Sequence, residues 1–88
     1  MSKLDIFTTS TYRLLSYLYD KKLPDNYIYF TQDEVAKDMG LSRATINRLI
    51  NDLRENNYLD LYGPHFGRYK MTELGIKVVE TFRKIENI

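Results

Sequence analysis

The sequence has no cysteine and a single histidine, which excludes several kinds of structural site from the start. Without cysteine, neither a disulfide framework nor a thiolate metal site can supplement the core. One histidine cannot form a multi-histidine site within one chain, and Lys37 interrupts the acidic cluster of Asp33, Glu34 and Asp38. We therefore predict no metal and no cofactor, and we expect stability to come from packing or from a partner subunit.

Long apolar runs are absent as well. No run approaches the roughly 18 residues that span a bilayer, and no charged leader with an apolar core opens the chain. We expect a cytoplasmic protein without membrane contact. Its 88 residues suffice for one small domain but not for a separate catalytic or ligand-binding domain. No nucleophile with a partner base is evident, so neither an enzyme nor a small-molecule ligand is predicted.

Charge is nearly balanced, with a net value of +1, whereas nucleic-acid-binding domains are often strongly basic. The distribution is uneven, however. Residues 42–70 hold five basic and three acidic residues, while residues 1–41 sum to −1 and residues 71–88 to zero. The excess is small, which predicts modest non-specific affinity for nucleic acid and dependence on a second protomer.

The most informative stretch runs from Thr31 to Leu53. Thr31 and Glu34 have the spacing of a capping box at the start of a helix. Gly40 offers a left-handed stop, and Ser42 can cap a second helix or hydrogen-bond a phosphate. Apolar residues at helical spacing would face a common core, namely Val35, Met39, Leu41, Ile46, Leu49, Ile50 and Leu53. The pattern predicts two short helices crossing at a tight turn, a helix-turn-helix.

In such a motif the second helix protrudes enough to enter the major groove of DNA. Arg43 and Arg48 can each bond a guanine edge, and Asn47 and Asn51 can each bond an adenine edge. A polar outer face is also what any amphipathic helix shows, and this alternative stays open for the two asparagines. It is weaker for the whole face, because residues 42–51 contain no acid although the chain has twelve.

Helical spacing of Leu14, Leu15 and Leu18 predicts an earlier helix over residues 9–22. A turn follows, and the alternation of residues 27–30 predicts a short strand. Residues 1–8 show no clear period and suit either a frayed arm or an extra helical turn.

Beyond the second motif helix, Asn57 offers a left-handed stop. Residues 58–62 and 68–71 alternate with period two, and residues 63–67 form a turn-rich connection. The result is a hairpin, called a wing. The side chains expected to face the core are Leu59, Leu61, Tyr69 and Met71, and those expected to face solvent are Asp60, Arg68 and Lys70.

The last predicted helix begins after a Thr72 cap and carries one apolar stripe. The stripe comprises Leu74, Val78, Val79, Phe82 and Ile85, with Ile88 as an extension. It can cover its own domain or bury against another copy, and we expect a mixture of both.

On the wing, Arg68 and Lys70 can meet phosphate or a narrow minor groove. The alternative is a solvated strand face on which they pair with Asp60. His65 lies in a turn and suits a backbone or phosphate contact rather than catalysis. The eight tyrosines suit core or interface packing better than base stacking, with Tyr62 beside the wing turn as the one to watch.

The order of elements resembles the winged helix-turn-helix superfamily. Residues 40–50 resemble the reading helix of catabolite-activator-type regulators, which implies DNA contacts by Ser42, Arg43 and Arg48. Ala44 stands where many of those proteins carry an acid, so the resemblance implies no particular operator sequence.

Residues 68–75 are similar to the close of the wing in MarR-type regulators, which dimerise through their terminal helices. That resemblance implies a homodimer in which the first and last helices form the interface. The residues implied are Leu14, Leu18, Phe82 and Ile85.

The predicted fold is mainly α with a small β-hairpin (α+β), a winged helix-turn-helix in the order helix, strand, helix, helix, strand, strand, helix. Residues 1–88 would form a single domain, with the helix-turn-helix over 31–56, the wing over 58–71 and the terminal helix over 73–87.

The predicted function is sequence-specific binding of double-stranded DNA by a small homodimeric transcriptional regulator. Helix 42–56 would enter the major groove, and the wing at 62–70 would touch the flanking backbone or minor groove. One alternative is an accessory protein of a plasmid, phage or conjugative element, and another is an interaction module that never binds DNA. The candidate DNA contacts are Thr31, Ser42, Arg43, Ala44, Thr45, Asn47, Arg48, Asn51, His65, Arg68 and Lys70.

Overall fold

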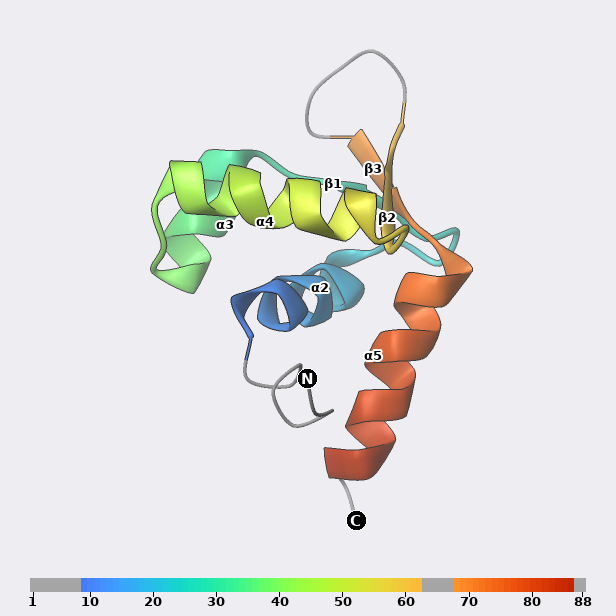
Figure 1. Cartoon of the computed structure of the whole chain (residues 1–88). Helices are drawn as coiled ribbons and strands as arrows, with labels where there is room; N and C mark the ends of the chain where they lie inside the picture. Colours follow the sequence, from blue (N-terminus) through green and yellow to red (C-terminus); the bar gives the residue numbers. More distant parts are fainter. Residues whose placement is uncertain (1–8, 63–67, 87–88) are drawn as a thin grey trace.

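The structure, a computed structural model, describes residues 9–62 and 68–86 and has the predicted order of elements (Figure 1). The elements are α2 (Ser10–Lys21), β1 (Tyr27–Tyr29), α3 (Gln32–Met39), α4 (Arg43–Glu55), β2 (Leu59–Leu61), β3 (Arg68–Met71) and α5 (Glu73–Glu86). This is the winged helix-turn-helix that the sequence predicted. Among the helices described, none combines the length and apolar character that crossing a membrane would require.

Each of the described helices, α2 to α5, begins at a hydroxyl side chain. Thr9, Thr31, Ser42 and Thr72 each accept a hydrogen bond from the backbone amide three residues later, at 3.0 to 3.2 Å. These bonds satisfy amides that have no partner inside the helix. The capping box is confirmed only in its first half, because the Glu34 carboxylate accepts from the Lys21 ammonium at 2.7 Å.

Two turns use left-handed backbone where the sequence predicted it. Gly40 ends α3 with φ of 68°, and Asn57 follows α4 with φ of 63°. Asn26, before β1, has φ of 72°. Asparagine adopts this region more readily than most residues with a side chain, so these positions set the chain direction between elements.

The sheet has the order β1-β3-β2 and is antiparallel throughout. β1 lies in sequence before the helix-turn-helix, and β3 comes after it. Tyr27 pairs with Lys70, Ile28 with Tyr69 and Tyr29 with Arg68. The central strand is therefore the second strand of the wing, and it joins the two ends of the helix-turn-helix segment.

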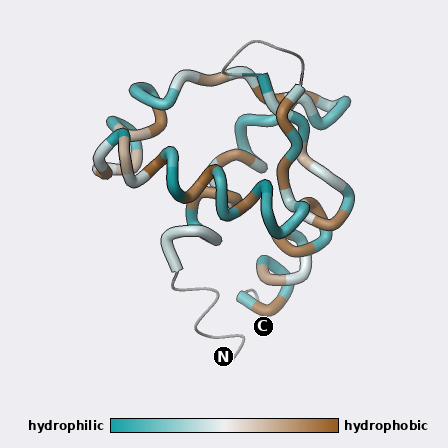
Figure 2. The backbone as a smooth tube through the Cα atoms, turned by 45° about the horizontal axis from the view of Figure 1, so that its top comes forward, coloured by the Kyte–Doolittle hydropathy of each residue, from teal (hydrophilic) through white to brown (hydrophobic). Residues whose placement is uncertain are grey.

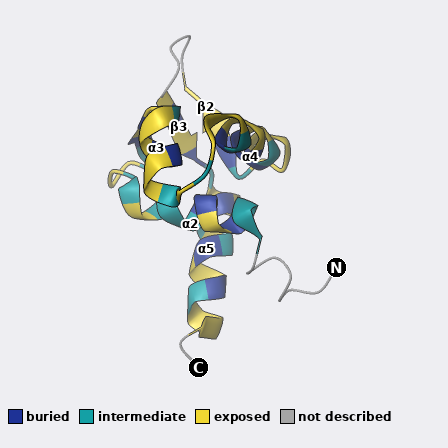
Figure 3. Cartoon of the chain, turned by 90° about the vertical axis from the view of Figure 1, so that its left-hand side faces the viewer, coloured by how far each residue is buried: buried dark blue, intermediate teal, exposed yellow. Residues whose placement is uncertain are grey.

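The core lies where α2 meets α4 and α5. Polar and apolar residues alternate along the helical segments in Figure 2, and the buried positions turn inward (Figure 3). Leu14, Leu15 and Leu18 of α2 are almost completely buried, as are the apolar residues of α4. The buried residues of α4 are Ile46, Leu49, Ile50 and Leu53, all of which were predicted to face the core.

Leu61 and Leu74 were expected to be covered by the domain but are exposed, and Ile85, expected to meet another copy, is exposed as well. Leu61 is 38 % exposed because it ends the edge strand β2, two residues beyond the buried Leu59. Leu74 and Ile85 are 49 % and 43 % exposed. The buried face of α5 is set by Gly75, Val79 and Phe82, which turns Leu74 and Ile85 toward solvent.

The expected dimer residues are corrected by the same burial. Leu14, Leu18 and Phe82 are covered by the chain's own core, and the Phe82 ring lies 4.9 Å from that of Tyr12. These side chains cannot face a second copy unless the core opens. The apolar stripe of α2 was located correctly, but it is covered by α4 and α5 of the same chain rather than by a second copy. Ile85 alone of the predicted set offers apolar surface.

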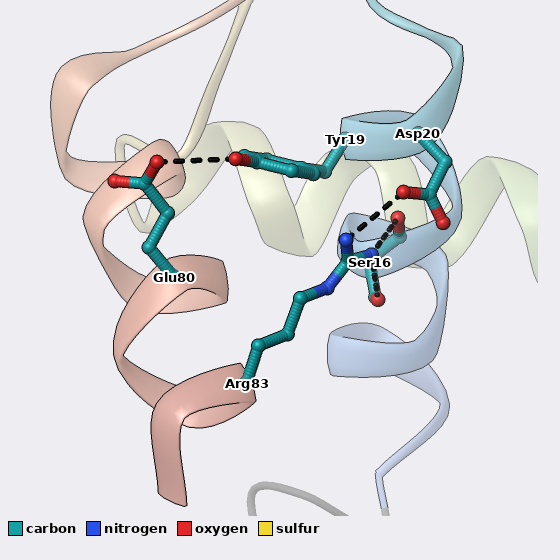
Figure 4. Close-up of polar contacts among 5 residues, drawn as sticks. All are labelled: Ser16, Tyr19, Asp20, Glu80 and Arg83. Carbon is teal, nitrogen blue, oxygen red and sulfur yellow. Dashed lines mark hydrogen bonds and ion pairs between the residues drawn. The ribbon is translucent and has the colours of Figure 1, made fainter. Parts of the chain in front are cut away.

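A polar network fixes α5 against α2 (Figure 4). The Arg83 guanidinium donates to the Asp20 carboxylate at 3.0 Å, and to the Ser16 hydroxyl at 2.9 Å and carbonyl at 3.2 Å. The Arg83 Cζ atom lies 4.7 Å from the centre of the Tyr19 ring, and the Tyr19 hydroxyl donates to Glu80 at 3.1 Å. Hydrogen bonding to Asp20 raises the pKa of Arg83 above its ordinary value.

Gly75 allows α5 to approach the segment that follows α4. A Cβ atom at this position would lie 2.4 Å from the Tyr58 carbonyl oxygen. The crossing is held on both sides, because the Thr72 amide donates to the Tyr58 carbonyl at 3.2 Å and the Thr72 hydroxyl donates to the Asn57 carbonyl at 2.6 Å. The backbone there has little freedom to move away.

Replacing Gly75 with alanine should therefore destabilise the fold by about 1–3 kcal/mol through overpacking. This expected loss of stability is opposite in sign to the effect of helix propensity, which favours alanine over glycine by up to about 1 kcal/mol. Denaturant unfolding of Gly75→Ala would measure the change, with the exposed Lys77→Ala as a control in the same helix. Equal or greater stability of Gly75→Ala would contradict the close approach.

Candidate nucleic-acid interface

The second helix of the motif, α4, separates sharply into two faces. Ile46, Leu49 and Leu53 point into the core, and the other side of the helix is open to solvent. The polar residues predicted to read DNA gather on that open side. Ser42, Arg43, Ala44, Asn47, Arg48 and Asn51 are exposed, and Thr45 is half-buried. In Figure 3, much of the α4 ribbon has the colour of exposed residues.

Both arginines of this face have an acid beside them. Arg43 lies 3.6 Å from Asp33 of α3, and Arg48 lies 3.7 Å from Asp52 one turn further along α4. All four side chains are exposed or nearly so, and ion pairs of this kind contribute little to stability. The acids hold the guanidinium groups loosely, and an incoming phosphate or base edge can replace them.

Asn47 is oriented by a residue that the sequence analysis did not select. The Gln32 side-chain amide donates to the Asn47 side-chain oxygen at 3.1 Å. That contact uses one lone pair of the Asn47 oxygen and fixes the orientation of the amide. The second lone pair and the NH2 group remain available to pair with an adenine edge. Asn51 has no such restraint among the described residues and borders a shallow hollow with Arg54 and Glu55.

The hydroxyl groups at the helix starts have structural partners. Ser42 accepts from the Thr45 amide, and its own proton goes to the Thr45 hydroxyl at 2.8 Å. Thr31 accepts from the Glu34 amide and keeps its proton to donate outward. Thr31 is thus the better placed of these hydroxyl groups to donate to a phosphate.

The wing residues lie on the outer face of the sheet. Arg68 and Lys70 are exposed on β3, and the Lys70 ammonium lies 5.1 Å from the centre of the Tyr27 ring. His65 falls outside the described residues. Arg54 completes the cationic surface, because it lines an open groove with Lys70 and Asp60 between the end of α4 and the hairpin.

Arg54 could have been found from spacing alone. It lies three residues after Asn51 and seven after Asn47, so all three share one face of a helix. Its charge also acts on Tyr69, whose pKa is raised by burial and partly lowered again by Arg54 and by a hydrogen bond from Gln32. The phenol therefore stays protonated beneath this part of the surface.

The acidic cluster on α3 is fully committed to other groups. Asp33 pairs with Arg43, Glu34 with Lys21, and Asp38 accepts from the Tyr17 hydroxyl at 2.5 Å. Within residues 9–62 and 68–86, no three histidine or acidic side chains lie close enough together to hold a metal ion.

Residues 8–59 match the family model described as a helix-turn-helix domain, which covers more than half of the chain. The chain belongs to this helix-turn-helix family. Its matched segment includes α2, β1, both helices of the motif and the start of β2. No curated protein sequence matches the chain.

Solved structures of MarR-family regulators share the fold of this helix-turn-helix protein. MepR, a transcription regulator of the Staphylococcus aureus multidrug efflux pump MepA, is 29 % identical with a TM-score of 0.73, and 94 % of this chain aligns with 62 % of that one. The S. aureus MepR–DNA complex is 28 % identical with a TM-score of 0.71, covering 97 % of this chain and 62 % of the other.

A MarR/EmrR family transcriptional regulator from Acinetobacter sp. ADP1 is 20 % identical with a TM-score of 0.68, and it shows likeness of fold alone. The alignment covers 94 % of this chain and 60 % of that one. The helix-turn-helix protein therefore spans about three fifths of the length of these regulators. It contains a helix-turn-helix DNA-binding domain similar to theirs.

Replacing Asp33 with asparagine should strengthen binding of this domain to random-sequence duplex DNA. The change frees Arg43 and removes a negative charge from the surface, and the loss of one exposed ion pair corresponds to at most about fivefold in affinity. Fluorescence anisotropy at low salt would measure the change. Glu86→Gln, which alters the net charge equally at the far end of α5, serves as the control. Equal effects of both variants would assign the gain to net charge alone.

Proposed function

We propose that this protein recognises a specific sequence in double-stranded DNA and regulates transcription. The observation that carries the proposal is the exposed side of α4 from Arg43 to Asn51, a segment without acids. Further along the same helix, Arg54 shares a groove with Lys70 of β3. A solved complex of the similar MepR with DNA supports it. A cytoplasmic location follows from access to DNA.

In this proposal α4 lies in the major groove, which admits one α-helix. Arg43 and Arg48 leave their acids and bond guanine edges, and the Ala44 methyl contacts a thymine methyl. Thr31, Ser42 and Thr45 position the helix through phosphate contacts rather than by reading bases. Arg68 and Lys70 meet the flanking backbone or minor groove.

The small charge excess argues for two copies acting together. A net charge of +1 supplies little non-specific attraction, so a pair of half-sites is the effective route to tight binding. We propose that the copies meet near the end of α5, where Ile85 is exposed. A two-fold arrangement would place one α4 in each of two major grooves about one helical turn apart.

Truncating the two arginines tests the reading role of α4. Arg43→Ala and Arg48→Ala should each cost about 1–3 kcal/mol of binding free energy and relax base preference at one position. Competition binding with single-base variants of the site would measure both effects. Lys77→Ala, on α5, should change neither. Unchanged binding and specificity in both arginine variants would instead favour an interaction module that does not use DNA.

Selection of bound sequences from random duplex DNA tests whether the protein acts as a dimer and whether it is a regulator or recognises an origin or transfer site. An enriched palindrome is expected, with affinity that falls steeply as salt increases. Ile85→Asp should reduce the mass of the protein in solution to that of one chain and weaken binding to the full palindrome more than to a half-site. Enrichment of direct repeats would favour recognition of an origin or transfer site. Absence of any enriched sequence would refute sequence-specific binding.

A further inference from the structure

The outer face of the sheet, opposite the core, carries alternating aromatic and charged side chains. Tyr29 of β1 pairs with Arg68 of β3, and the backbone amide of Tyr62 donates to the Arg68 carbonyl at 2.8 Å. These three residues form one row across the strands. Tyr27, Lys70 and Asp60 form the neighbouring row through their cross-strand pairs. We call these six residues the outer sheet face.

Two tyrosines of this face present much of their surface to solvent. Tyr29 is 54 % exposed and Tyr62 is 47 % exposed. The Tyr62 ring meets the half-buried Tyr27 ring edge-on, with centroids 4.7 Å apart. This contact holds Tyr62 above the sheet. The core uses the opposite side of the same strands, where Ile28 and Tyr69 are buried.

The other six tyrosines are buried or half-buried and have structural uses, and that of Tyr27 is its contact with Tyr62. Tyr12 and Tyr69 are buried, Tyr17 and Tyr19 donate to carboxylates, and Tyr58 packs against the core. Folding therefore accounts for them. Exposed aromatic rings grouped on one sheet face are informative in a way that scattered apolar residues are not.

We propose that the outer sheet face binds single-stranded nucleic acid. Bases would stack on Tyr29 and Tyr62, and Arg68 lies between them in the row, where the phosphate linking two bases would pass. Stacking on aromatic rings suits a single strand, because a duplex keeps its base faces covered. The charge agrees, since Arg68 and Lys70 outnumber the single acid Asp60.

The face is continuous with the surface of α4. Arg54 lines the open groove together with Tyr62 and Lys70, and it also borders the hollow beside Asn51. A strand lying on the outer sheet face would therefore pass directly to the reading helix. Recognition of the duplex uses α4 together with Arg68 and Lys70, and the inferred activity shares these two cations. Tyr29 and Tyr62 serve the inferred activity alone, so substitution of the tyrosines separates the two.

The test measures binding of the full chain to a fluorescent oligothymidine of about 12 nucleotides. Tyr29→Ala and Tyr62→Ala should each weaken this binding by about tenfold, while Tyr29→Phe retains it because stacking needs the ring and not the hydroxyl. Leu74→Ala, which removes a similarly exposed apolar side chain from α5, should leave it unchanged. Affinity should fall as salt increases.

Duplex binding by the same variants separates this inference from the proposed function. Tyr29→Ala should keep its affinity for duplex DNA, and Arg43→Ala should keep its affinity for oligothymidine. Equal losses on both ligands would overturn the inference by making the face part of the duplex interface. No saturable binding of oligothymidine by the intact chain, or a solution mass that falls to one chain in Tyr29→Ala, would also overturn it. Far-ultraviolet circular dichroism would establish that each variant is folded.

Discussion

Burial of one face of α2 is the constraint on which the other elements depend. α4 packs against α2, in which Leu14 and Leu18 are fully buried, and α5 is fixed against the same helix by Arg83 and its partners. Because α2 fills the space beneath both helices, α4 can place its polar side entirely outward. The exposed reading surface is thus a consequence of how completely the opposite side is packed.

The charged side chains of this molecule are placed beside partners of opposite sign, so its net charge says little about its local charge. Asp33 and Asp52 sit beside the two arginines of α4, and Asp60 lies opposite Lys70 in the sheet. Such an arrangement keeps the general attraction for phosphate low while leaving cations where a specific ligand can replace their partners. A net charge of +1 is therefore compatible with a surface that binds nucleic acid selectively.

Most of the fold could be predicted from local signals in the sequence. Contacts between segments distant in the sequence could not. Hydroxyl caps and Gly40 located the helix ends because capping depends on three or four neighbouring residues. Pairing of β1 with β3 joins residues about forty positions apart and leaves no local trace. The stripe of α2 was clear, yet spacing cannot tell whether a helix of the same chain or a second copy covers Leu14 and Leu18. At the site, α4 was predictable from composition, whereas Gln32 depends on tertiary contact.

The pairing of β1 with β3 also has a mechanical consequence. β1 precedes the helix-turn-helix and β2 follows it, and both are hydrogen-bonded to the same central strand. The segment between them is closed into a loop, so α4 cannot tilt without carrying the hairpin with it. In the proposed complex, α4 and the strands of the wing would therefore move together on the DNA. Only residues 56–58 separate α4 from β2, so a base pair inserted between their contacts would have to be absorbed by bending or twisting of the DNA.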